Sequence, residues 1–146
     1  MNCIKEYEKM TERIKDRVEI ELEMVDLSDL EFDLVDDYHS ENSLASYTWK
    51  DGRKIKTNLR YFYDYLITEP KNEIEFDAII SHEIGHYIHE KYWGFEFFPR
   101  LQTLVFYFGD ISNVELFAEA FSTWVTDNDR ENEVVIMMDE ILSILK

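Results

Sequence analysis

The five residues from His82 to His86 constrain the fold of this chain more than any other part of its sequence. They are His-Glu-Ile-Gly-His, and they use two of the four histidines in the chain. Residues four apart on an α-helix lie one turn apart on the same face. The spacing therefore predicts a helix that presents both imidazoles to one zinc ion, with the Glu83 carboxylate beside them. The alternative is a pair of ordinary histidines on an acidic helix.

Gly85 gives a second indication about this helix. Glycine in a helix interior costs about 1 kcal/mol relative to alanine. A residue with that cost usually permits close approach of another part of the chain. We therefore expect a second backbone segment to pack against the motif helix at Gly85.

The remaining helices are predicted from apolar residues that recur every three or four positions. The stretches with this pattern are residues 4–25, 112–126 and 129–145, with shorter helices at residues 60–67 and after Pro99. The motif helix is expected to begin between Pro70 and Glu75 and to end at Tyr92 or Trp93.

A small mixed sheet is predicted from three shorter segments. Residues 44–50 and 53–58 flank Asp51-Gly52, a pair that favours the positive φ angles of a type I′ hairpin turn. Alternate lysines in the second arm are common on exposed edge strands. A further strand is predicted at Leu30–Val35, followed by a polar loop at residues 36–43. Helices and sheet together predict an α+β fold in one domain, residues 1–146.

The charge of the chain restricts its partners. The formal net charge is −17, from 32 acidic and 15 basic residues. Such a surface repels phosphate, which argues against a general binder of nucleic acid or of anionic membranes. It suits a protein or peptide substrate with basic residues, or a basic partner protein. No apolar stretch approaches the roughly 20 residues of a membrane-spanning helix.

Cysteine usage and the first residues predict the compartment. Cys3 is the only cysteine in the sequence, so no internal disulfide can form and a reducing compartment is favoured. The first residues contain no apolar core of a signal peptide. We expect a cytoplasmic protein, although secretion without a cleaved signal would leave the same sequence.

A catalytic zinc site needs a third protein ligand. His89 lies about 10 Å along the helix axis from His82, too far to share one ion on a straight helix. The longer pattern of the metzincins would require histidine at Tyr92, so that class is excluded. Downstream, Glu115 and Glu119 lie one turn apart on one face of a predicted helix, as a ligand and its hydrogen-bonding neighbour would.

Two segments, residues 82–86 and 115–121, resemble the catalytic helices of gluzincin zinc metallopeptidases. The second is Glu-Leu-Phe-Ala-Glu-Ala-Phe. It is similar to the anthrax lethal factor type, where Phe-Ala-Glu-Ala-Phe follows the glutamate ligand, and more loosely to ImmA/IrrE-like metallopeptidases. The resemblance covers residues 74–126 and implies a small thermolysin-like domain. It implies that Glu115 is the third zinc ligand and that Glu119 orients a ligating imidazole.

The resemblance also implies a mechanism of peptide hydrolysis. Zinc on His82, His86 and Glu115 would lower the pKa of its water towards 7 and polarise the scissile carbonyl. Glu83 would take a proton from that water and deliver it to the leaving amine. An extended substrate would pair with the sheet edge, which we expect at residues 55–59.

One position departs from the lethal factor type. That type carries a tyrosine seven residues before its glutamate ligand, thought to stabilise the oxyanion, and here the position is Phe108. Either a one-residue shift brings Tyr107 into this role, or the oxyanion is stabilised differently. The competing hypothesis is a catalytically silent zinc-binding regulatory or interaction protein, an acidic decoy for basic partners.

Overall fold

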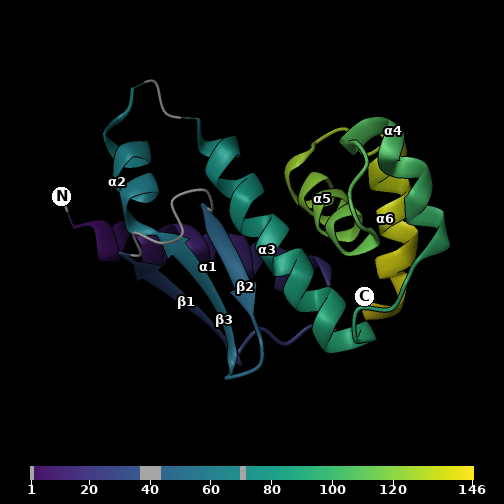
Figure 1. Ribbon diagram of the computed structural model, residues 1–146, viewed down its shortest axis with the longest axis horizontal. Coiled ribbons are helices and arrows are strands. Elements are labelled where there is room, and N and C mark those ends of the chain that lie inside the picture. Colours follow the sequence, from purple (N-terminus) through teal and green to yellow (C-terminus); the bar gives the residue numbers. More distant parts are fainter. Residues whose placement is uncertain (1, 37–43, 70–71) are drawn as a thin grey trace.

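The computed structural model describes residues 2–36, 44–69 and 72–146. Its elements, in order, are α1 (Cys3–Glu21), β1 (Leu30–Val35), β2 (Ala45–Thr48), β3 (Arg53–Asn58), α2 (Leu59–Ile67), α3 (Glu73–Trp93), the 3-10 helix η2 (Pro99–Leu104), α4 (Val105–Phe108), α5 (Asn113–Thr126), α6 (Glu133–Leu142) and the 3-10 helix η3 (Ser143–Leu145). Helices and a small mixed sheet make this an α+β fold, as predicted (Figure 1). Most of the loop expected at residues 36–43, and Pro70, lie outside the described residues.

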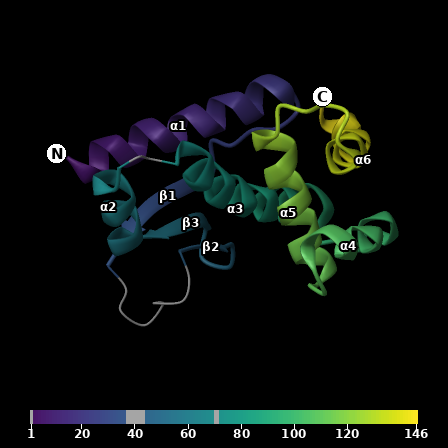
Figure 2. The ribbon, with the colours of Figure 1, turned by 90° about the horizontal axis from the view of Figure 1, so that it is seen from above.

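The sheet has the strand order β1-β3-β2. β1 runs parallel to β3 with Leu30 opposite Arg53, whereas β2 runs antiparallel to β3 with Tyr47 opposite Ile55. Ile55 is fully buried, so one face of the sheet belongs to the core. The long helix α1 crosses behind the sheet, as Figures 1 and 2 show from two directions.

β3 is the central strand, so the prediction that residues 55–59 form a free edge is wrong. Its alternate lysines lie on the open face of the sheet instead. Lys54 Nζ is 3.3 Å from Asp33 and 3.7 Å from Glu31, both on the neighbouring strand β1. Period-two lysines indicate an exposed face, and an exposed edge is a separate property that depends on the partner strands. The edge beside α3 is β2.

The predicted hairpin between β2 and β3 is confirmed, but its turn is not type I′. Thr48 pairs with Lys54, so Asp51 lies at the centre of a longer loop. A type I′ turn needs positive φ at both central residues. Gly52 has a φ of 93°, whereas the one described non-glycine residue with positive φ is Phe95.

The motif helix α3 runs between the sheet and α5, and it packs closely against α5 (Figure 1). Asn72 caps its first turn by accepting the Glu75 N–H, and Gly94 ends it with left-handed backbone angles. A Cβ added at Gly85 would lie 3.0 Å from Phe121 Cβ and 3.1 Å from Ala118 Cα. The expected close approach of a second backbone at Gly85 is confirmed.

Two helix ends differ from the predictions made from apolar spacing. α1 ends at Glu21, although Leu22 and Val25 remain buried in a non-helical segment. α6 begins at Glu133, because the Asn132 side chain caps its first turn. Within the described ranges, no helix is long and apolar enough to cross a membrane.

Candidate functional site

The facing sides of α3 and α5 bring together the three residues that the sequence predicts as metal ligands. Glu115 of α5 lies against both imidazoles of α3. One carboxylate oxygen is 3.0 Å from His82 Nε2 and the other is 3.1 Å from His86 Nε2. The two imidazole ring centroids are 4.8 Å apart. All three side chains therefore meet at one place between the helices.

Glu115 also belongs to a helix cap. Its backbone N–H donates to Ser112 Oγ at 3.3 Å, which is the hydrogen bond that caps the N-terminus of α5. That bond engages only the backbone, however, and the Glu115 carboxylate lies on the two histidines. The first turn of α5 is thus fixed by its cap while the side chain is available to the site.

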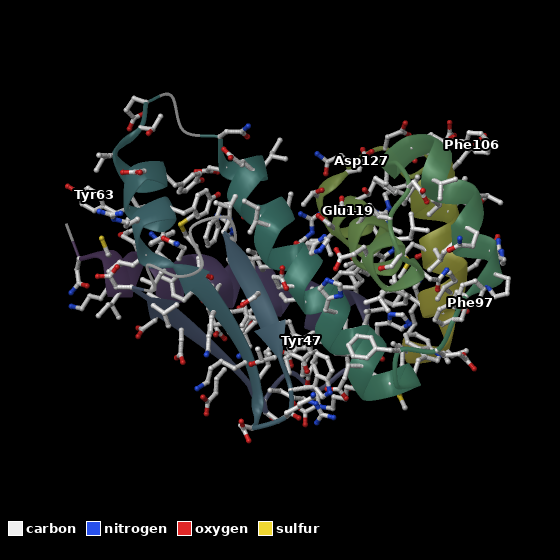
Figure 3. The ribbon with its side chains drawn as sticks, in the orientation of Figure 1. Tyr47, Tyr63, Phe97, Phe106, Glu119 and Asp127 are labelled. Carbon is white, nitrogen blue, oxygen red and sulfur yellow. The ribbon has the colours of Figure 1, made fainter. Side chains whose placement is uncertain are left out.

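Glu119 lies one turn further along α5, on the side that faces α3 (Figure 3). Its carboxylate is 3.0 Å from His82 Nδ1, the ring nitrogen that does not face Glu115. This hydrogen bond lowers the pKa of Glu119. A carboxylate on Nδ1 fixes the tautomer and orientation of the imidazole and leaves Nε2 as the coordinating nitrogen.

Glu83 is 8% exposed, the least exposed carboxylate of the group. Burial raises the pKa of Glu83 to about 7. The nearby His82 acts to lower this pKa, and the charge of Glu115 acts to raise it by a smaller amount. The backbone N–H of Tyr47 faces the carboxylate closely enough to favour its ionised form. A carboxyl group that titrates near neutrality can both accept and return a proton.

The two imidazoles differ electrostatically. Burial acts to lower the pKa of His82, but the hydrogen bond to Glu119 and the charges of Glu83, Glu119 and Glu115 outweigh it and raise the pKa overall. Burial lowers the pKa of His86, which therefore favours the neutral form that a metal ligand needs.

These side chains fit a tetrahedral metal ion. Ligand atoms around zinc, at bond lengths of about 2.0–2.2 Å, lie roughly 3.3 Å from one another. One Glu115 oxygen is 3.0 Å from His82 Nε2 and the other is 3.1 Å from His86 Nε2, so each of these nitrogens has a carboxylate oxygen at nearly that separation. Glu83 is a second carboxylate within reach, since its oxygen and one nitrogen of each histidine lie within 4.8 Å of one another. Glu115 is the better third ligand because it contacts both Nε2 atoms directly.

A cleft of about 330 Å³ opens beside the group. It is lined by Leu44, Ala45, Ala78, Ile79, His82, Glu83, Glu119 and Ser122. The cleft therefore lies between the β2 edge and the N-terminal half of α3. A larger hollow of about 1100 Å³ lies between the start of α1 and α2 and includes none of the candidate residues.

Tyr107 is not brought to the histidines. It lies on the short helix α4 with 58% of its surface exposed, and its hydroxyl donates to Glu133 of α6 at 2.6 Å. Neighbouring helical residues point about 100° apart, so a one-residue shift from Phe108 turns the phenol to another side of the helix. The structure gives no support to the predicted catalytic role of Tyr107.

His89 is fully buried and lies away from Glu115, as expected from its position on the helix. One nitrogen, Nε2, is 2.7 Å from the Glu96 carbonyl oxygen, and the ring stacks on Phe117 at a centroid distance of 4.2 Å. Burial lowers the pKa of His89. The contact of His89 with Glu96 stabilises the turn after α3, and its ring is part of the core.

Sequence reasoning missed the position of Tyr47. A tyrosine in a hairpin strand gives no indication of function. The position of Tyr47 beside α3 depends on the parallel pairing of β1 with β3, which leaves β2 at the edge of the sheet. The structure places the Tyr47 backbone beside Glu83.

No protein-family model, curated protein or solved structure matches this chain. The geometry of the site and the His82–His86 motif are therefore the features from which a function can be inferred.

Proposed function

We propose that this protein is a zinc-dependent metallopeptidase of the gluzincin type. The observation that carries the proposal is the position of Glu115, within hydrogen-bonding distance of both Nε2 atoms. In the described part of the chain, no lysine or arginine pairs with Glu83, Glu115 or Glu119. Three carboxylates that share two imidazoles, with no lysine or arginine of the described residues paired to them, favour a bound cation.

His82, His86 and Glu115 would hold the ion, and Glu119 would orient His82. A zinc ion would supply a Lewis acid that lowers the pKa of water towards 7 and polarises a carbonyl group. Glu83 would act as general base and then as general acid, since its burial holds the pKa near the working pH. Burial of Glu83 and of the two imidazoles strengthens the electrostatic interactions between them, whereas the Glu115 and Glu119 side chains remain 45% and 41% exposed.

The substrate would bind along β2, in place of the β3 edge expected from the sequence. An extended peptide can add to the outer strand of a sheet through main-chain hydrogen bonds. β2 forms an edge of the sheet, and Ala45 lines the same cleft as Glu83. Leu44, Ala78 and Ile79 give that cleft an apolar wall, which suits an apolar side chain next to the scissile bond.

The test is Glu83→Gln, which removes the proton acceptor and keeps the shape of the side chain. We expect the variant to retain one zinc per chain while cleavage falls roughly 10²–10⁴-fold. Cleavage is measured by mass spectrometry on a proteome-derived peptide library, and zinc by elemental analysis. Glu75→Gln, on the same helix and exposed, is the matched control and should cleave like the parent.

Two outcomes would contradict the proposal. Glu83→Gln cleaving as fast as the parent would remove Glu83 from the chemistry, and a protein that stays metal-free in zinc would remove the site. Stoichiometric zinc with no cleaved peptide would favour the alternative of a catalytically silent binding protein. The placement of Tyr107 on Glu133 is the observation that favours this alternative, because it leaves the predicted oxyanion donor away from the histidines.

A further inference from the structure

A second polar cluster lies on α3, towards its C-terminal end, and connects the helix to the hairpin. We call it the brace; it consists of Asp29, Tyr47, Arg53, Tyr87, Glu90 and Lys91. Arg53 Nε and one terminal nitrogen donate to the two oxygens of Glu90, at 2.8 and 3.1 Å. The other terminal nitrogen donates to Asp29 at 2.8 Å. A bidentate guanidinium–carboxylate pair fixes direction as well as distance.

Tyr47 connects this pair to β2. Its hydroxyl donates to Glu90 Oε1 at 2.8 Å, and its ring meets the Tyr87 ring edge-on with centroids 6.0 Å apart. The side chain is buried between the hairpin and the C-terminal half of α3 (Figure 3). The position of β2 relative to α3 is thus fixed by the hydrogen bond between Tyr47 and Glu90, and Glu90 lies seven residues beyond Glu83 on α3.

The backbone of the same residue faces Glu83. Leu44 accepts a hydrogen bond from Asn58 N–H at 2.9 Å, so the backbone groups of Leu44 point towards β3. Backbone groups alternate along a strand, and those of Ala45 and Tyr47 therefore point to the outer edge. Ala45 lines the cleft together with Glu83, and the Tyr47 N–H faces the Glu83 carboxylate.

We propose that Tyr47 is a positioning residue, which sets the edge strand β2 at a fixed distance from Glu83 through its hydroxyl on the Arg53–Glu90 pair. The inference rests on the proposed function, because the edge matters to catalysis only if a peptide pairs with it. A misplaced edge would hold the scissile bond away from Glu83. Misplacement by about 1 Å can reduce a rate roughly a hundredfold.

Tyr47→Phe tests this, since it removes one oxygen and retains the buried ring. We expect backbone amide exchange at residues 45–48, followed by NMR, to accelerate about tenfold relative to the Ile55 amide of β3. For the library peptide that the parent cleaves fastest, kcat/KM should fall at least about tenfold while zinc affinity stays within about twofold. Tyr63→Phe, on the exposed side of α2 and remote in Figure 3, is the matched control and should change neither readout.

The outcomes separate this inference from the proposed function. A parent protein that cleaves no peptide would overturn the proposed function, and the exchange rates would still decide whether the hydroxyl holds the edge. Equal kcat/KM for parent and Tyr47→Phe, or exchange that accelerates equally at Ile55 and at residues 45–48, would overturn the positioning role. Arg53→Lys keeps the charge but not the bidentate pair. It should accelerate amide exchange at residues 45–48 by an amount between those of the parent and Tyr47→Phe, and an unchanged exchange rate would also count against the positioning role.

Discussion

The two polar clusters of α3, the brace and the candidate site, differ in how their negative charges are neutralised. In the brace, Arg53 pairs with Glu90 and Asp29, and Lys91 lies 3.0 Å from Asp29, so each acid has a cation of the protein beside it. The site cluster consists of His82, Glu83, His86, Glu115 and Glu119. Its three carboxylates face two imidazoles, and within the described ranges no lysine or arginine forms an ion pair with any of the three.

The difference indicates separate roles for the two ends of one helix. A cluster that neutralises itself contributes to stability without a ligand, whereas a buried carboxylate without a cationic side chain beside it, such as Glu83, favours a bound cation or a proton. Burial raises the pKa of Glu83 to about 7, so this carboxyl group takes up a proton more readily than an exposed glutamate, whereas the hydrogen bond to His82 lowers the pKa of Glu119. We therefore expect zinc to act on the site cluster alone, and substitutions in the two clusters to separate metal binding from stability.

The largest expected effect is that of Glu115→Gln on zinc binding. Four ligands contribute about 10–16 kcal/mol in structural zinc sites, so one ligand contributes about 3 kcal/mol, or at least about a hundredfold in affinity. At zinc concentrations about 100 times Kd, the parent should gain about 2.7 kcal/mol in free energy of unfolding. At the same concentration the variant should gain only about 0.4 kcal/mol. Urea unfolding with zinc and with a chelator measures both values.

Glu131→Gln is the matched control, because it removes one exposed acid of the same type from the turn before α6. It should keep the full zinc-dependent gain. If Glu115→Gln kept that gain as well, Glu115 would not be a ligand, and Glu83 would become the third ligand by proximity.

The next effect is that of Arg53→Met on stability. Arg53 is 32% exposed and donates three hydrogen bonds to charged acceptors, which are worth about 1.5–3 kcal/mol each when buried. Loss of this half-buried set should lower the free energy of unfolding by about 2 kcal/mol. The gain from added zinc should remain that of the parent. A variant that lost the zinc-dependent gain would show that the two clusters are not independent.

Lys54→Met is the matched control for Arg53. Lys54 pairs with Glu31 and Asp33 on the open face of the sheet, and both of these acids are well exposed. Exposed pairs contribute little. The control should therefore unfold at nearly the same urea concentration as the parent.

Much of the site cluster could be predicted from the sequence because its determinants are local. The spacing of His82 and His86, the glycine between them and the one-turn spacing of Glu115 and Glu119 each follow from helical periodicity. The structure brings these side chains together because Gly85 lets α5 approach α3. No long-range pairing had to be guessed beyond the contact of two helices.

The brace and the proposed substrate edge could not be predicted, because they depend on contacts between distant segments. The parallel pairing of β1 with β3 places β3 in the middle of the sheet, and nothing local in β3 encodes a partner more than 20 residues away. Tyr47 meets Glu90 only after that sheet has packed on α3. Tyr107 lies against Glu133 of α6 for a different reason, since a shift of one residue on a helix changes the direction of the side chain.

The smallest expected effect is the pH dependence that Asp29 gives to the brace. Burial acts to raise the pKa of Asp29, but hydrogen bonds from Tyr87, Lys91 and Arg53 outweigh it and lower the pKa to about 2. An unfolded aspartate titrates near about 3.9. Because the folded value is the lower one, the stabilisation is complete above about pH 4 and is lost as the pH falls through about 2.

The size of this loss is limited by solvent. The Asp29 side chain is 41% exposed, so screening should keep its contribution below about 1 kcal/mol. The measurement is the difference in free energy of unfolding between the parent and Asp29→Asn, in chelator, at pH 6, 4 and 3. Between pH 6 and 4 the difference should hold nearly constant, and below pH 4 it should shrink. A difference that grew as the pH fell would mean that the Asp29 carboxylate is not stabilised by its three donors, and the brace would then not be the self-neutralised cluster contrasted with the site.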